Sequence, residues 1–308
     1  MPRLTRRPPR PTPVGFTFVE LLISVALLAV VGTVVVNITL GQERLYQRLQ
    51  AQTAARHELR TALALVPVDL RGIAPAAGDL EDFAEQFVEF RAPIGTGIVC
   101  AQTAAPALDL PPTHQRRNVL TTWSTPPRAG DTAWVFLEGP SDGAEDDRWD
   151  PRRIVAVTAI SAACAGTPFL DPGADAGRAG TRLTVDQPLP DSGLIGAPVR
   201  ITRSTRYGLE RQPSGRWYLS RSEYADGSWQ ASAAVSGPFA APVRNGVAGV
   251  RFAYFDSVGA PITDPALAHR VARIDLAIAT DATGRGLSSG APIPTDSIAF
   301  RMALRNRQ

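Results

Sequence analysis

The chain has 308 residues, of which 44% are hydrophobic and 20% charged. This composition predicts a largely folded protein with one large or two smaller domains, and it excludes a mainly disordered chain. The formal net charge is +3, all basic residues are arginine, and four of them precede Gly15, so the rest of the chain is close to neutral. The charge therefore gives little support for nucleic-acid binding by the folded part.

The first predicted element is a membrane-spanning helix. Residues 16–40 contain one ionisable side chain, that of Glu20, and about 20 apolar residues are enough to cross a bilayer. The upstream arginines predict a cytoplasmic N-terminus. A secretory signal peptide would be shorter and would end in a small-residue cleavage site. A plain signal anchor gives no reason for Glu20, because an unpaired carboxylate in hydrocarbon is costly.

The order Gly15-Phe16-Thr17-Phe18-Val19-Glu20, followed by an uncharged apolar run, resembles the class III signal of type IV pilins and pseudopilins. The resemblance implies that residues 1–15 are a leader, that a prepilin peptidase cleaves between Gly15 and Phe16, and that Phe16 becomes N-methylated. It also implies that residues 16–40 form the membrane helix and later the filament core, where Glu20 pairs with the N-terminal amine of a neighbouring subunit. The alternative is that Glu20 only reaches toward the membrane surface.

Residues 41–78 are predicted to continue this helix and then link it to the next domain. An apolar stripe at helical spacing requires a surface to pack against, and Pro67 is expected to end or kink the helix. The stripe consists of Leu45, Leu49, Leu59, Leu63 and Val66.

Residues 79–308 are predicted to be β-rich, because short alternating apolar runs are separated by Pro, Gly and Asp. The segments 100–117 and 164–180 are expected to be long loops, and we interpret residues 80–200 as an expansion of the β-rich domain. Cys100 and Cys164 begin these two segments and are candidates for a disulfide, with two unpaired thiols as the alternative. Strands are predicted at 86–92, 119–124, 131–139, 153–161, 181–187, 197–212, 216–224, 249–256, 271–280 and 297–306.

The C-terminal third resembles PilW-like minor pilins and J-type minor pseudopilins of type II secretion. The similar stretches are Asn245–Asp256, Val271–Leu276 and Phe300–Arg307. The resemblance implies a pilin-like α+β fold, with a long N-terminal helix packed on an antiparallel β-domain. It implies a structural subunit that helps to initiate, cap or assemble a type IV pilus or a type II secretion pseudopilus.

The partners implied by this family are the prepilin peptidase, other minor and major pilins or pseudopilins, the inner-membrane assembly platform and membrane lipid. The implied location is the bacterial inner membrane, with one membrane pass and a periplasmic domain, and then the filament. The alternative function is an adhesin or a DNA- or substrate-binding module at the filament tip.

Enzyme chemistry and cofactor binding are not predicted. The two Gly-x-Ser-x-Gly matches, at Ser141 and Ser288, fall in loops without the strand before and helix after that a nucleophile elbow requires. An acidic loop is a weak Ca²⁺ candidate, but its spacing is not that of an EF-hand, and a solvated hairpin tip is the preferred interpretation. Its carboxylates are Asp142, Glu145, Asp146, Asp147 and Asp150.

Overall fold

A computed structural model describes most of the chain, in two compact parts that meet between Ala54 and Ala55. Apart from the side chain of Arg48, the described residues are 15, 17–102, 106–116, 119–141, 143, 146–161, 163–189, 194–225, 227–242, 248–280 and 296–304.

The helix α1 (Phe18–Arg71) is longer than the sequence predicted, because it continues through Pro67. Proline inside a helix removes one hydrogen bond and costs about 3 kcal/mol. The turn after it is held by tertiary contacts: Leu70 is fully buried, and the hydroxyl of Tyr207 donates to Asp69 at 2.8 Å. These contacts compensate for the proline, so of the two predicted outcomes at Pro67, an end or a kink, the helix end does not occur.

The second part of the chain buries one stripe of α1. Leu59, Ala62, Val66 and Leu70 recur at spacings of three or four residues and are 0–6% exposed. Full burial of each large side chain stabilises the packing by about 2 kcal/mol. The stripe predicted from the sequence is thus buried in its C-terminal half, whereas Leu45 and Leu49 are exposed.

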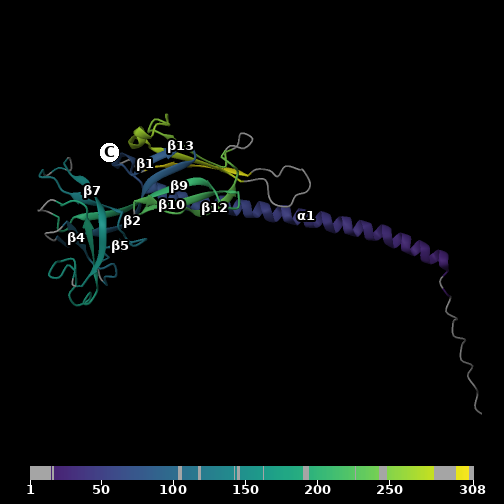
Figure 1. Ribbon diagram of the computed structural model, residues 1–308, viewed down its shortest axis with the longest axis horizontal. Helices are drawn as coiled ribbons and strands as arrows, with labels where there is room; N and C mark the ends of the chain where they lie inside the picture. The colour runs from purple at the N-terminus through teal and green to yellow at the C-terminus, as the bar shows by residue number, and fades with distance from the viewer. Residues whose placement is uncertain are drawn as a thin grey trace, which may run out of the picture. The chain divides into compact units, whose positions relative to one another are not determined.

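The larger sheet is antiparallel and is organised around β9 (Pro198–Arg211) (Figure 1). Along one edge, β9 pairs with β2 (Phe87–Ile98) for almost its whole length. Along the other edge it pairs first with β6 (Thr132–Leu137), through residues 199–202, and then with β10 (Trp217–Ala225), through residues 205–211. The sheet therefore divides into two branches along the length of β9.

The first branch continues from β6 to β7 (Arg148–Ile160), β8 (Gly180–Val185), β4 (Ala107–Leu110) and β3 (Ala101–Gln102). The second branch adds β11 (Ser228–Trp229) and β12 (Ala233–Phe239) to β10. The strand β1 (Leu80–Ala84) extends the β2 side and β5 (Thr122–Trp123) pairs with the far end of β2. A short 3₁₀ helix η1 (Pro75–Ala77) connects α1 to β1.

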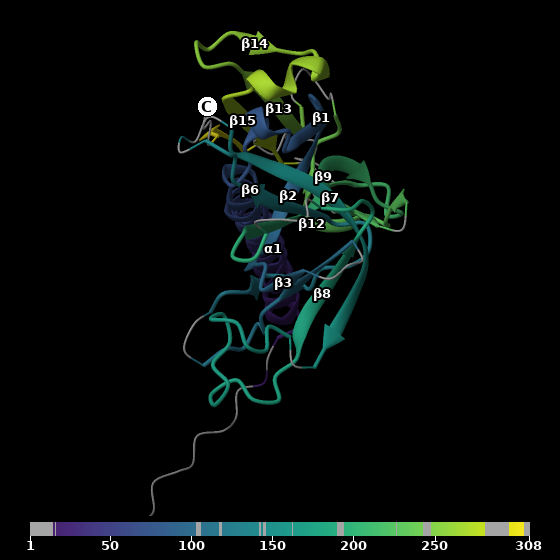
Figure 2. The same cartoon turned by 90° about the vertical axis from the view of Figure 1, so that its left-hand side faces the viewer.

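The smaller sheet has the order β14 (Pro261–Ile262), β13 (Val250–Phe255), β15 (Arg273–Ala279) and β16 (Ser297–Ala303), all antiparallel. A 3₁₀ helix η2 (Pro265–Arg270) joins β14 to β15. This sheet lies near the start of β2, and the β8–β4–β3 strands lie near its end (Figure 2). The described chain is thus α+β, with one long N-terminal helix and an antiparallel β-rich remainder.

Two hydrophobic cores correspond to the two branches. The first core joins the buried stripe of α1 to β1, the first half of β2, β10, β12 and the inner face of the smaller sheet. The second core lies among β2, β4, β6, β7 and β8 and contains no residue of α1. Within the segment 80–200, the part that starts at Ile94 therefore has a core of its own, whereas β1 and the first half of β2 belong to the first core.

All ten strands predicted from the sequence are present, although the one at 119–124 is reduced to β5. The prediction of a long loop at 100–117 was wrong in part, because β3 and β4 lie within it. All four residues of β4 are buried, and β4 pairs with β8. Its short apolar sequence, Ala107–Leu110, is too brief to be distinguished from a loop by periodicity.

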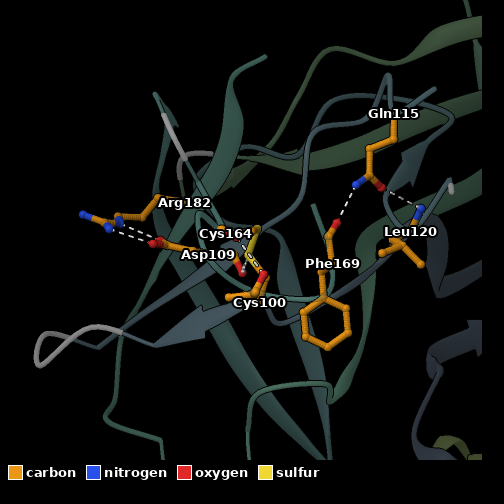
Figure 3. The surroundings of a disulfide bond; sticks show 8 residues. Cys100, Asp109, Gln115, Leu120, Cys164, Phe169 and Arg182 are labelled. Atoms are coloured by element: carbon orange, nitrogen blue, oxygen red, sulfur yellow. Dashed lines mark hydrogen bonds and ion pairs between the residues drawn. A yellow bond between two sulfur atoms is a disulfide. The ribbon is translucent and has the colours of Figure 1, made fainter. Parts of the chain in front are cut away.

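Cys100 and Cys164 are joined in a disulfide, with 5.2 Å between their Cα atoms (Figure 3). Cys100 lies just before β3 and Cys164 just after β7, so the bond ties the 163–179 connection to the β4 side of the sheet. Next to it, the guanidinium of Arg182 donates to both carboxylate oxygens of Asp109 at 2.7 and 2.8 Å. The amide of Gln115 donates to the carbonyl of Phe169 at 2.6 Å, which holds the same connection from its other side.

Replacement of both cysteines by serine should lower the free energy of unfolding by up to about 4 kcal/mol, because the bond closes a loop of 64 residues in the unfolded chain. Denaturant titration of the full chain in detergent measures the loss. Reduction of the unmodified protein is the matched control and should give a shift of similar size. An unchanged unfolding midpoint would show that the disulfide does not stabilise the second core.

Candidate functional site

The start of α1 is capped by Thr17. The backbone N–H of Glu20 donates to the Thr17 hydroxyl oxygen at 3.3 Å, and the N–H of Leu21 donates to the Thr17 carbonyl at 3.2 Å. Thr-x-x-Glu is the capping-box spacing, and a carboxylate in the first helical turn is stabilised by the helix dipole. Thr17 and Glu20, which belong to the motif that resembles the pilin signal, thus also stabilise the N-terminus of helix α1.

Glu20 is exposed and makes no ion pair within the described part of the chain. Gly15 is exposed as well, and Phe16 lies outside the described residues. A pairing between the Glu20 carboxylate and an amine on Phe16 is therefore an inference from the resemblance. A charge placed in this apolar surface still requires a partner once water is removed.

The N-terminal half of α1 presents a continuous apolar surface. Every large apolar side chain from Phe18 to Leu40 is between 47% and 75% exposed. The helix is long and apolar enough to span a membrane, and no part of the chain that the structure describes buries its most apolar stretch. Patches of this size mark surfaces that are covered by lipid or by another protein.

The polar side chains within this apolar surface are largely satisfied by the helix itself. The hydroxyls of Ser24, Thr33 and Thr39 each donate to the carbonyl four residues earlier, at 2.8–2.9 Å. Hydroxyls bonded in this way do not require water. The surface therefore suits an apolar environment throughout, with the Glu20 carboxylate as its charged group.

The C-terminal half of α1 is attached to both sheets by polar contacts as well as by its buried stripe. Glu58 accepts hydrogen bonds from the hydroxyl of Ser236 and from the backbone N–H of Gly237, both at 3.0 Å, at strand β12. Arg56 pairs with Asp296 at 3.0 Å, just before β16. The helix is thus fixed between the β10–β12 branch and the smaller sheet.

A buried ion-pair network lies where β9 passes from β6 to β10. Arg203 is 2% exposed, and its guanidinium donates to both carboxylate oxygens of Asp131 at 2.8 and 2.9 Å and to Glu223 at 3.1 Å. Asp131 directly precedes β6, whereas Glu223 belongs to β10. Arg203 therefore bridges the two branches at the point where their backbone pairing is interrupted.

The same network reaches α1. Arg221 donates to Glu223 at 2.6 Å and lies 3.8 Å from the Asp69 carboxylate, which also accepts the Tyr207 hydroxyl. Burial alone would raise the pKa of Glu223, but the hydrogen bonds and charges of Arg221 and Arg203 outweigh burial and lower it below the ordinary value. Glu223 therefore stays ionised at neutral pH and pairs with both arginines. Sequence reasoning missed this network, because its members are far apart in the chain.

The described carboxylates of the acidic loop, those of Asp146, Asp147 and Asp150, are bonded to groups of the chain itself. Asp146 accepts from the backbone N–H and the hydroxyl of Ser141, and the latter bond lowers the Asp146 pKa. Asp147 accepts from Gly139, and Asp150 pairs with Arg152 at 2.6 Å. Asp142 and Glu145 lie outside the described residues. Among the described ones, no group of three or more His, Cys, Asp or Glu side chains is placed to hold a metal ion.

The two Gly-x-Ser-x-Gly matches gain no support. Ser141 lies in the loop between β6 and β7, and its hydroxyl donates to Asp146 rather than to a histidine. Ser288 lies outside the described residues. Comparison of the chain with protein families, with curated proteins and with solved structures finds no match.

Replacement of Arg203 by methionine should destabilise the protein by about 3–5 kcal/mol, because it leaves the buried carboxylate of Asp131 unpaired. Arg251 pairs with Glu85 at 3.2 Å, but both are largely exposed, so Arg251→Met is a matched control that should cost less than about 1 kcal/mol. Denaturant titration compares the two. Equal losses would show that the buried position of Arg203 has no special role.

Proposed function

We propose that this chain is a minor subunit of a type IV pilus or of a type II secretion pseudopilus. Its role is structural: it helps to initiate, cap or assemble the filament. The observation that carries the proposal is the continuous helix α1. Gly15 and Thr17 precede it, Glu20 lies in its first turn, its N-terminal half is exposed and apolar, and its other half is packed into a β-rich domain.

Such a helix suits two successive environments. Before assembly its apolar half lies in lipid, where the Thr and Ser hydroxyls are bonded to the backbone. During assembly the same half leaves lipid and packs among the helices of other subunits, which replace one apolar environment by another. The cost of moving the helix is therefore small, and Glu20 gains a partner only in the assembled state.

The charge pair gives this transition a direction and a register. Cleavage after Gly15 creates a cationic amine on Phe16, and opposite charges attract strongly where the dielectric constant is low. A carboxylate one helical turn from its own N-terminus is placed to accept the amine of the adjacent subunit. Misplacement along the axis would leave two unpaired charges in an apolar core, so the pair disfavours wrong registers.

An adhesin or a DNA- or substrate-binding module at the filament tip is the second candidate. The second hydrophobic core, which contains no residue of α1, favours it, because the extension built on that core is not needed to hold the helix. Filament yield in a deletion strain separates the two functions. A pure binding module should leave filament number unchanged, whereas an initiating subunit should be required for it.

The mature protein isolated from a host with a prepilin peptidase should begin at N-methylated Phe16. Mass spectrometry of the intact chain and of its N-terminal peptide measures this directly. Gly15→Leu should leave the full leader in place, because the resemblance implies a cut directly after this glycine. Any other N-terminus in the unmodified protein would overturn the proposed function.

Glu20→Ala should insert into the membrane and be cleaved normally, but incorporation into filaments should fall at least tenfold, because the neighbouring amine loses its partner. The amount in sheared filaments relative to the membrane measures incorporation, and mass spectrometry verifies cleavage. Asn37→Ala, in the same apolar run, is the matched control and should assemble normally. Normal assembly of Glu20→Ala would contradict the proposed charge pair and leave Glu20 with a role in helix capping alone.

A further inference from the structure

The outer edge of β16 differs from the other sheet edges in the described part of the chain. Natural edges are usually protected by short length, proline, irregular register or a covering element. β3 and β14 have two residues each, β1 has a register shift, and β12 contains Pro238 and contacts α1 through Ser236. β16 has seven residues in continuous register with β15 and contains neither proline nor lysine.

The hydrogen bonds at both ends of β16 show which of its backbone groups face outward. The backbone N–H of Leu304 donates to the carbonyl of Ala272 at 2.9 Å, and the carbonyl of Asp296 accepts from the backbone N–H of Thr280 at 3.0 Å. Even-numbered positions therefore point toward β15. Because backbone groups alternate along a strand, the odd positions, Ser297, Ala299, Arg301 and Ala303, direct their N–H and carbonyl groups away from it. No strand among the described residues pairs with these groups.

The side chains beside this edge leave room for another strand. Three of the four outward positions are small, and Arg301 extends over the open face with 78% of its side chain exposed. On the inner face, Ile298 is 39% exposed. Arg71 of α1 lies over the ring of Phe300, with its guanidinium carbon 5.4 Å from the ring centroid. On the inner side, the edge therefore offers the exposed part of Ile298 as an apolar contact.

The open face of the smaller sheet favours an acidic partner. Arg273 and Arg301 share the single carboxylate of Asp275, at 3.1 and 3.5 Å, whereas Arg251 has its own partner in Glu85 at 3.2 Å. An acidic residue opposite Arg301 would give this arginine a carboxylate that it does not share with Arg273. Opposite charges on directly facing strand positions are stabilising, and like charges are destabilising.

We propose that the outer edge of β16 binds an extended segment of another polypeptide as an antiparallel fifth strand. The bound segment places an acidic side chain opposite Arg301 and apolar side chains on the inner face, beside Ile298. Main-chain hydrogen bonds to Ser297, Ala299, Arg301 and Ala303 provide the affinity, and the alternating side chains provide the specificity.

A second copy of this chain is the less favoured occupant. Residues 297–303 contain no acidic side chain, so antiparallel pairing of two β16 edges would place no carboxylate opposite Arg301. A second copy therefore does not supply the charge that this edge favours.

The probe is the synthetic peptide Thr-Val-Glu-Val-Thr-Val-Thr, acetylated, amidated and labelled with a fluorophore. Paired antiparallel with residues 297–303, it puts its third residue, glutamate, opposite Arg301 and its valines on the inner face. Fluorescence anisotropy with the full chain in detergent should show saturable binding. Substitution of lysine for the glutamate should weaken binding at least fivefold.

Methylation of single peptide nitrogens separates strand pairing from non-specific apolar binding. The N–H of the third residue points at β16, so its methylation should weaken binding at least tenfold. The N–H of the fourth residue points away from β16, so its methylation should change binding less than twofold. Peptides that merely adhere to the detergent or to the apolar half of α1 would respond equally to both changes.

Two variants of the chain complete the test. Ala299→Pro removes an outward N–H without removing a bond to β15, and it should weaken binding at least tenfold while circular dichroism stays unchanged. Arg301→Glu should invert the preference, so that the lysine peptide binds more tightly than the glutamate peptide. Arg251→Glu, on the same face but two strands away, is the matched control and should keep the original preference.

The proposal is overturned by failure of the glutamate peptide to bind, by equal sensitivity to the two methylations, or by undiminished binding to Ala299→Pro. It is also overturned if the unmodified chain is a dimer that Ala299→Pro dissociates in analytical ultracentrifugation, because the edge would then belong to a second copy. A wrong N-terminus in mass spectrometry would contradict the proposed function and leave these binding results unaffected.

Discussion

The packing of one stripe of α1, from Leu59 to Leu70, is the contact on which the rest of the molecule depends. This stripe closes the first core by filling the space between the β10–β12 branch and the inner face of the smaller sheet. The same helix carries the exposed apolar surface at its other end. Any force on that surface reaches the β-rich domain through this stripe, and the contacts at Glu58, Arg56 and Asp69 resist sliding of the helix along it.

β9 connects this helix-bearing core to the second core. It pairs with β6 before residue 203 and with β10 after it, so the sheet would be open at this point without further bonds. Arg203 closes the opening by bonding Asp131 on one branch and Glu223 on the other. A buried guanidinium is stable only when all its partners are in place, so it fixes one relative position of the branches.

The sequence predicted the local features of this fold better than the long-range ones. Alternation of apolar and polar residues predicted β13, β15 and β16, because periodicity depends on neighbouring residues alone. Pairing of β9 with three strands and the meeting of Arg203 with Asp131 depend on residues far apart in the chain. The helix does not end at Pro67, because the tertiary contacts of Leu70 and Asp69 outweigh the local cost of a proline in a helix. The strand β12 was not predicted, because Gly237 and Pro238 are poor strand formers. At the candidate site, the pattern of Thr17 and Glu20 could be recognised in the sequence, because helix capping and the length of an apolar run depend only on neighbouring residues.

The two cores have different consequences for variation in this chain. Substitutions in the second core reach α1 only through β9 and the Arg203 network, since no residue of α1 belongs to that core. Substitutions among Leu59, Val66 and Phe252 act on the helix directly, because these residues share the first core. The part of the chain built on the second core is therefore free to change its surface without loosening the helix, provided that Arg203 keeps both carboxylates. A surface that varies while its anchor is preserved is what a subunit requires if partners recognise its β-rich part and the assembly holds its helix.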